Sequence, residues 1–360
     1  MSALVLTRVR LRLEALAQGT LPGTLAAPMR AAWGPALRQV ACPREPACAQ
    51  VCVEPRDCAF GLAFTALPPV AGWGGTPPRS LWLQHDLLVA RHLSKGDHVE
   101  IGLVLAPAAA EHLPVLVDGL RVAAARGIDR IPFAVERSGE PERWTLERAT
   151  EEAGSWEDCR AVTVRLLTPL RLKVGGRLLT RAPELCELVG NLASRASALS
   201  AAHGGSSGVA TTALRSAAEE ARVAHGDVRW LRLARPRHGR TPDSMSGLVG
   251  EVLYRDVPQA VHPWLVLAGV LHAGADAMVG CGRVAAAPAS RVITDAESMR
   301  LAASLAVERV RAVNGPLSSV AVDYPEPDHL LVRIEDPASA MAELRDLAEA
   351  LDVRISVRSR

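Results

Sequence analysis

Alternating strand-like and helix-like segments in the N-terminal part of the chain constrain its fold more than any other feature. Residues 3–13 alternate apolar and polar side chains, as a half-buried strand does, and residues 28–41 carry apolar side chains on one helical face. A second clear strand at 98–106 leads into a helix at 109–126, whose apolar residues recur three and four positions apart. With a closing strand at 130–137, we interpret the order as strand, helix, strand, strand, helix, strand. This is the split βαβ order of a ferredoxin-like domain.

The second half of the chain repeats this pattern more loosely. Strands are expected at 160–172, 228–236 and 246–254, and helices at 182–199, 210–225 and 259–272. The polar, Glu-rich segment 140–158 is interpreted as a linker, so we expect one ferredoxin-like domain at 1–150 and a second at 159–288. The fold class is then α+β, with tandem ferredoxin-like (RRM-like) domains.

Residues 289–360 are expected to form a small acidic α+β extension of unknown role. The expected elements are helices at 295–313 and 339–351 and strands at 318–322, 330–334 and 353–357.

Positive charge is concentrated in the middle of the chain. Residues 161–290 contain 15 Lys and Arg against 9 Asp and Glu, although the whole chain has a net charge of only +2. Such a distribution suits the phosphate backbone of a nucleic acid. Lys95 and Lys173 are the only lysines, so the cations are almost all arginines. Arginine recognises phosphate through a planar fork of donors.

Several classes of protein are excluded by what the sequence lacks. The longest apolar run, residues 263–275, spans about 13 residues and is too short to cross a bilayer. Arg8, Arg10 and Arg12 interrupt the N-terminus where a signal peptide needs an apolar core, so we expect a cytoplasmic protein without a membrane partner. A P-loop is missing, as is a GxGxxG motif after a strand, so no nucleotide cofactor is expected.

The most informative segment is residues 247–283, where a strand and a helix precede a loop with little side-chain bulk. Gly274, Gly280 and Gly282 occur in this loop among small residues. A loop of this kind lets backbone N–H groups approach a phosphate closely. The same pattern is typical of a tight helix-to-strand connection, in which the glycines only satisfy positive φ angles.

Six segments, in sequence order, resemble the RAMP-superfamily endoribonucleases that cut precursor CRISPR RNA within its repeats. In that family a GLxGxxxY-like strand precedes a helix ending in a His-x-Gly step and a glycine-rich turn, which residues 247–283 resemble. The segment VRLLTPLRLK at 164–173 is similar to the family's TPLRLK strand. The remaining similar segments are an N-terminal helix, a Cys-bearing loop, a strand with its helix, and a Trp- and Arg-bearing strand, at 21–37, 42–60, 96–127 and 230–240.

The resemblance implies a metal-independent endoribonuclease that cuts CRISPR repeat RNA. The 2′-hydroxyl attacks its own phosphate and leaves a cyclic phosphate and a 5′-hydroxyl. The implied partner is CRISPR precursor RNA, with CRISPR effector or adaptation proteins as further partners, and no cofactor is implied for catalysis. Two departures keep alternatives open, since Ala275 stands where the family commonly has Lys, and residues 14–60 contain neither His nor Tyr. The alternatives are a non-catalytic RNA-binding RAMP subunit of a CRISPR effector complex and an unrelated α+β protein with a structural zinc.

Histidine supplies most candidates for proton transfer, because its pKa suits a general acid or base. His272 lies at the end of the helix that enters the glycine-rich loop, and His238 lies among arginines. Both are candidate catalytic residues; the alternatives are a helix cap for His272 and an RNA backbone contact for His238. The candidate RNA-binding residues are Arg171, Lys173, Arg235, Arg237, Arg240, Gly274, Gly280, Gly282 and Arg283.

Four cysteines, Cys42, Cys48, Cys52 and Cys58, lie in one short Pro-rich loop. Four thiolates satisfy a tetrahedral zinc ion, and a short irregular loop gains stability from a metal. Their spacing is not that of the paired CxxC motifs of zinc ribbons. Plain reduced cysteines are therefore an equally good interpretation in a cytoplasmic chain.

Overall fold

The structure is a computed structural model of the chain. It describes residues 4–359 apart from 24, 43–56, 66–77, 86–89, 158, 204, 206–209, 233, 236–242, 290–302, 304–305, 308–309, 312, 314–319, 327–328 and 352–353.

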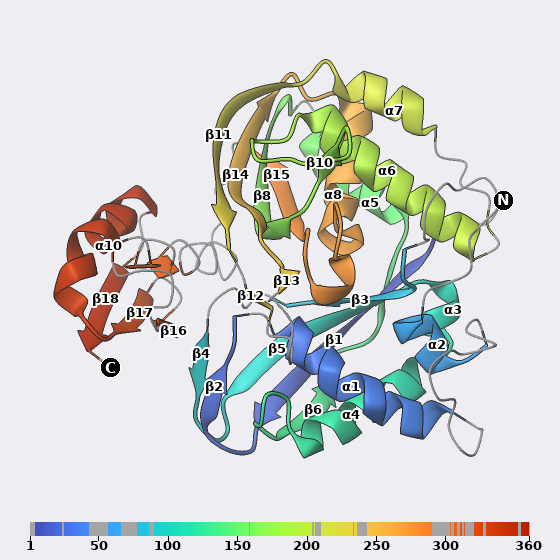
Figure 1. The fold of residues 1–360 in the computed structure, drawn as a ribbon. Coiled ribbons are helices and arrows are strands. Elements are labelled where there is room, and N and C mark those ends of the chain that lie inside the picture. The colour runs from blue at the N-terminus through green and yellow to red at the C-terminus, as the bar shows by residue number, and fades with distance from the viewer. Residues whose placement is uncertain are drawn as a thin grey trace.

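The first sheet has the strand order β3-β5-β1-β6, with every neighbouring pair antiparallel. Its strands, with β7 pairing to the end of β1, are β1 (Leu6–Ala15), β3 (Leu81–Gln84), β5 (His98–Leu105), β6 (Phe133–Arg137) and β7 (Glu142–Trp144). In chain order these four strands lie second, third, first and fourth across the sheet, which is the ferredoxin-like arrangement. Helices α1 (Ala26–Ala41) and α4 (Leu113–Arg126) pack together on one face (Figure 1).

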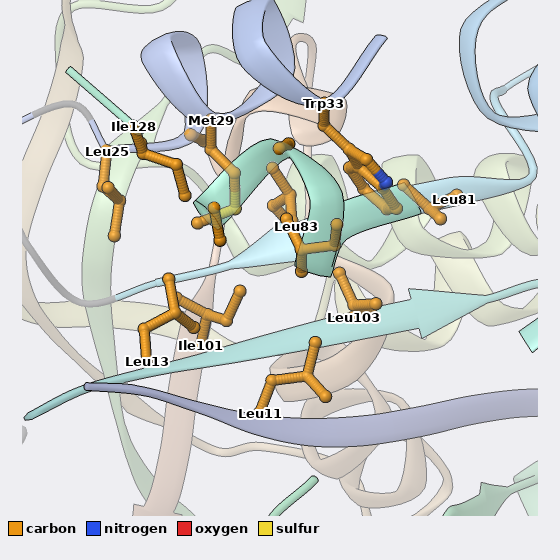
Figure 2. Close-up of a cluster of buried hydrophobic side chains, with 14 of the residues drawn as sticks. Leu11, Leu13, Leu25, Met29, Trp33, Leu81, Leu83, Ile101, Leu103 and Ile128 are labelled. Carbon is orange, nitrogen blue, oxygen red and sulfur yellow. The ribbon is translucent and has the colours of Figure 1, made fainter. Parts of the chain in front are cut away.

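Alternation along β1 fixes which face of this sheet is inside. Leu11 and Leu13 are fully buried, whereas Arg10 and Arg12 between and beside them are exposed. Figure 2 shows the two leucines on the side of their strand that faces α1, from which Met29 and Trp33 extend. Burying large apolar side chains in this way supplies the main driving force for folding, at roughly 1.5–3 kcal/mol each.

The second sheet has the same topology, with the strand order β11-β14-β8-β15, again antiparallel throughout. Its strands are β8 (Ala161–Leu170), β11 (Arg222–Leu231), β14 (Gly247–Arg255) and β15 (Val284–Pro288). The helices that connect them are α6 (Leu185–Ala202), α7 (Thr211–Ala218) and α8 (His262–Leu271). A short hairpin of β9 (Lys173–Val174) and β10 (Arg177–Leu178) follows β8. The prediction of tandem ferredoxin-like folds is confirmed.

The linker expected at 140–158 is wrong for most of its length. β7 extends the first sheet, and α5 (Leu146–Ala153) packs against α8 of the second half. Thr145 caps α5 by accepting a hydrogen bond from the N–H of Arg148 at 3.2 Å. The polar composition that indicated a linker belongs to the outer face of α5, whose Ala149 and Ala153 are buried.

The two ferredoxin-like folds share one packed interface. On β3, Leu81 and Leu83 point into the first core, whereas Trp82 lies on the opposite face and belongs to the core of the second half. The indole N–H of Trp82 donates to the carbonyl of Val270 in α8 at 2.9 Å. The face of the first sheet that α1 and α4 leave uncovered is therefore covered here by α8.

The remaining elements are short or belong to the C-terminal extension. The short ones are β2 (Gly19–Leu21), β4 (Arg91–Leu93), α2 (Ala59–Phe64), α3 (Pro107–Ala110), β12 (Ala234–Arg235), β13 (Asp243–Ser244) and the 3-10 turns Gly154–Trp156, Gln259–Val261 and Ala277–Val279. The extension contains β16 (Ala321–Glu326), β17 (His329–Ile334), α10 (Pro337–Leu351) and β18 (Arg354–Ser359). It is an α+β unit with its own small core, as predicted, although much of the helix expected at 295–313 lies outside the described residues. No helix in the described part of the chain is long and apolar enough to span a membrane.

Candidate functional site

The glycine-rich loop, residues 272–283, connects α8 to β15 and lies where the two folds meet. Its 3-10 turn, Ala277–Val279, contacts α1 and β3 of the first fold. Val279 and Cys281 are buried in the core of that first fold, although the loop belongs to the second. Figure 1 shows the end of α8 beside β3, where this loop begins. The loop therefore depends on both halves of the chain for its position.

Three glycines of the loop are required by backbone geometry. Gly274, Gly280 and Gly282 have φ angles of 76°, 84° and 75°, which L side chains rarely adopt. A Cβ at Gly282 would lie 1.7 Å from the carbonyl oxygen of Ala273, and one at Gly274 would lie 2.7 Å from the carbonyl oxygen of Arg171. The alternative interpretation of this loop, a tight connection that needs positive φ angles, accounts for these glycines.

The N–H groups of the loop donate mostly to the protein itself. Ala273 N–H donates to Gly282 O at 2.7 Å, and Gly282 N–H donates to Pro169 O at 3.1 Å. Gly274 N–H donates to the side-chain oxygen of Asn191 at 2.7 Å. These bonds hold the loop in one shape, and the contact of its glycines with RNA stays a prediction.

His272 is fully buried at the start of the loop, and both of its ring nitrogens are hydrogen-bonded. Nδ1 lies 3.0 Å from the carbonyl oxygen of Cys281, so it carries the proton and donates. Nε2 lies 3.2 Å from the amide nitrogen of Gln84 and accepts from it. The same Gln84 nitrogen donates to Gly269 O at 2.8 Å. The backbone of His272 has a φ of 60°, a strained value that these bonds stabilise.

The surroundings of His272 keep its ring neutral. Burial, with the nearby charges of Arg195 and His85, lowers the pKa of His272 to about 3. The hydrogen bond to the carbonyl of Cys281 raises this pKa, but its effect is smaller than that of burial. A general base must reach the proton that it removes, and here both ring nitrogens are already engaged inside the protein. This geometry favours a positioning role for His272, and its catalytic role stays a prediction.

The lowered pKa gives a testable pH dependence of stability. The unfolded chain takes up this proton near pH 6.5 and the folded chain only near pH 3, so stability falls as the pH drops through that window. Between pH 7 and pH 5 we expect His272 to account for a loss of about 2 kcal/mol in the free energy of unfolding. Urea unfolding at both pH values would measure it. The His272→Gln variant should lose less stability over the same interval, and an equal loss in both proteins would contradict the buried neutral ring.

Arg195 is a residue of this site that sequence reasoning missed. It comes from α6, and its guanidinium lies 4.9 Å from the ring centre of Trp82. Its Nε donates to the carbonyl of Leu271 at 2.9 Å, at the end of α8. Burial lowers the pKa of Arg195 to about 10. No local sequence pattern predicts this role, because Arg195 lies in an ordinary helical segment of α6.

Of the predicted RNA-binding cations, Arg171 forms contacts within the protein, whereas Lys173 is exposed to solvent. Arg171 forms an ion pair with Asp276 of the loop at 2.8 Å and donates to the carbonyl of Ser246. Lys173 is exposed at the base of the β9–β10 hairpin. Arg283 is half-buried and lines a pocket of about 450 Å³ with Arg8 of β1. Arg171 thus holds the loop, and RNA contact by these three residues stays a prediction.

The other predicted site residues are only partly described. His238, Arg237 and Arg240 lie outside the described residues, and Arg235 is described only by its backbone in β12. The structure therefore does not bring His238 and His272 together or separate them.

Two of the four predicted zinc ligands, Cys48 and Cys52, also lie outside the described residues. Cys42 ends α1 as its C-cap, and Cys58 stands at the start of α2. Within the described part of the chain, no three His, Cys, Asp or Glu side chains gather as a metal site. The zinc site stays a prediction.

Comparison with known proteins connects these features to a family. Residues 164–284 match the family model described as CRISPR-associated endoribonuclease Cas6, and residues 4–154 match a model described as an N-terminal domain. No curated protein matches the chain by sequence.

The chain is also similar to solved structures. A Cas6 product complex is 17% identical, with a TM-score of 0.50, over 78% of this chain and 100% of that chain. A Thermus thermophilus Cas6 is 17% identical, with a TM-score of 0.48, over 80% and 100%. A partial Cas6-RT-Cas1–Cas2 complex is 12% identical, with a TM-score of 0.49, over 97% and 64%.

Two ferredoxin-like folds in tandem, with a glycine-rich loop at their junction, make up most of the chain, and its fold is similar to that of the Cas6 product complex. The second of the two folds contains the segment that matches the endoribonuclease model. This part of the chain, residues 164–284, is similar to the Cas6 family of CRISPR-associated endoribonucleases.

Proposed function

We propose that this chain cuts the repeats of precursor CRISPR RNA without a metal ion, by attack of a 2′-hydroxyl on the adjacent phosphate. The match of residues 164–284 to the Cas6 endoribonuclease model carries this proposal. The net positive charge of the same part of the chain supports it, because a phosphate backbone needs cations along its path.

The reaction needs three kinds of group. A base takes the proton of the 2′-hydroxyl as its oxygen forms a bond to phosphorus. The bond from phosphorus to the 5′ oxygen then breaks, and an acid gives that oxygen a proton. Cations stabilise the negative charge that builds up on the phosphate oxygens between these events. The products are a cyclic phosphate and a 5′-hydroxyl, and no water is consumed.

Different residues of this chain suit different parts of that chemistry. We propose that Lys173 and Arg283 contact the phosphates, because Lys173 is exposed at the start of the β9–β10 hairpin and Arg283 is the last residue of the glycine-rich loop, where it lines a pocket. Arg171, through its ion pair with Asp276, is proposed to hold the loop. His238 is the proposed proton-transfer group, and His272 is proposed to act as a positioning residue through its bonds to Gln84 and Cys281.

The proposed partner is CRISPR repeat RNA, and other CRISPR proteins are proposed as further partners. The extension at residues 321–359 has its own core and so could present a separate surface to such proteins.

The first test is cleavage of the cognate repeat RNA in excess EDTA. We expect full cleavage in EDTA, because no step of the proposed reaction uses a metal. An RNA with one 2′-deoxy substitution at the cut site should remain uncut, since the attacking oxygen is gone, and the unsubstituted RNA is its matched control. Product ends should be a cyclic phosphate and a 5′-hydroxyl. Tight binding without product would contradict the proposal and indicate a non-catalytic RNA-binding subunit.

A further inference from the structure

A second polar pocket lies next to the glycine-rich loop, since Asn191 of its lining is hydrogen-bonded to Gly274. It has a volume of about 300 Å³ and lies between the β9–β10 hairpin, α6 and α7. Its lining is polar or small at most positions, and the described residues that line it include no aromatic side chain. A nucleobase usually stacks on an aromatic ring, so this pocket suits a phosphate better than a base.

Two cations give the pocket its charge. Lys173 lines it from the hairpin and Arg215 from α7, and both are exposed. Among the described residues, neither forms an ion pair with a carboxylate. Glu187 is the acidic residue of the lining. Its two carboxylate oxygens accept hydrogen bonds from the guanidinium of Arg181 at 2.7 and 3.0 Å. The pocket therefore has a net positive charge available for an anion.

Gly190 and Asn191 of α6 shape the floor of the pocket. The stem of Arg215 passes over Gly190, where an added Cβ would lie 3.5 Å from its Cδ. The side-chain oxygen of Asn191 accepts the N–H of Gly274, which leaves its amide N–H₂ to donate elsewhere. Ser194 adds a hydroxyl to the lining. Cations together with amide and hydroxyl donors are the groups that bind phosphate oxygens.

Asn191 also connects the pocket to the proposed site of cleavage. The same side chain lines the pocket and accepts the N–H of Gly274, so the pocket and the glycine-rich loop meet at Asn191. We propose that this pocket binds a backbone phosphate of the substrate RNA, with Arg215 and Lys173 as its cations and Asn191 as its neutral donor. This inference rests on the proposed function.

The Arg215→Ala variant tests the pocket through the salt dependence of RNA binding. Arg215 is exposed on α7, so its replacement should leave the fold intact. We expect about tenfold weaker binding of the repeat RNA at moderate salt, and a slope of log affinity against log salt that is smaller by about 1. The matched control is Arg126→Ala, which removes the same charge from the exposed end of α4 in the first fold and should leave the slope unchanged. A second variant, Asn191→Asp, keeps the acceptor for Gly274 but turns the donor into a negative charge, and it too should weaken binding.

The outcomes separate this inference from the proposed function. If the unmodified protein neither binds nor cuts the RNA, the proposed function fails. If it does both, and Arg215→Ala has the same affinity and slope as Arg126→Ala, the pocket assignment is overturned while the function stands. The last measurement is the melting temperature of the unmodified protein and of Arg215→Ala, with and without inorganic phosphate. Stabilisation of the unmodified protein but not of Arg215→Ala, with unchanged RNA affinity, would identify a small free anion and overturn the RNA assignment.

Discussion

The Gly282→Ala variant should lose RNA cleavage by a factor on the order of 100 or more. The added Cβ would lie 1.7 Å from the carbonyl oxygen of Ala273, and the φ angle of 75° already disfavours any side chain. Ala273 and Gly282 are joined by a hydrogen bond of 2.7 Å, so the clash separates the two ends of the loop. Cleavage rates under single-turnover conditions would measure the effect, with the melting temperature recorded for each variant.

Gly96→Ala is the matched control. Gly96 also has a positive φ, of 91°, but a Cβ there would meet nothing within 4 Å. We expect a stability cost of about 1 kcal/mol from backbone strain alone, with cleavage unchanged. If Gly282→Ala folds and cuts at the rate of Gly96→Ala, the glycine-rich loop is not part of the site of cleavage.

Replacing Trp82 with alanine should cost about 3–5 kcal/mol in the free energy of unfolding, one of the largest effects available from a single side chain. Trp82 is fully buried between the two folds, and its loss leaves a cavity against α8. The carbonyl of Val270 loses its donor, and the guanidinium of Arg195 loses the ring on which it lies. Urea unfolding followed by two probes, one in each fold, would measure the cost.

The Trp82→Phe and Trp33→Ala variants complete this experiment. Phenylalanine keeps a ring in the interface but removes the hydrogen bond to Val270. We therefore expect Trp82→Phe to lower the free energy of unfolding by about 1–2 kcal/mol. Trp33 is equally buried but belongs to the core of the first fold. Its loss should lower stability without separating the unfolding of the two folds, whereas Trp82→Ala should separate them. Coincident unfolding of both folds in Trp82→Ala would contradict the role of this contact.

The fold was predictable because its elements carry clear periodicity. β1 alternates buried leucines with exposed arginines, and β14 and α8 lie close to their expected ranges. The exceptions are informative. β3 is four residues long and buried on both faces, so it shows no alternation. α5 was interpreted as a linker because its small buried face, Ala149 and Ala153, is weak beside its charged one.

The candidate site was predictable only in its location. The sequence identified the loop after α8, because its glycines are visible locally. It could not reveal that His272 is buried, since its partner Gln84 lies 188 residues away in the chain. Arg195 and Asn191 were missed for the same reason: their partners, Trp82 and Gly274, are brought to them only by the tertiary fold.

The cover that α8 provides for the first sheet has a consequence for synthesis on the ribosome. Trp82 and its partner Val270 are 188 residues apart, so at roughly 5–20 residues per second about 10–40 s pass between their translation. During that interval the nascent first fold exposes Trp82 and Val104, which the second fold later buries. Conditions that slow translation prolong this exposure, and aggregation of stalled nascent chains should increase with it.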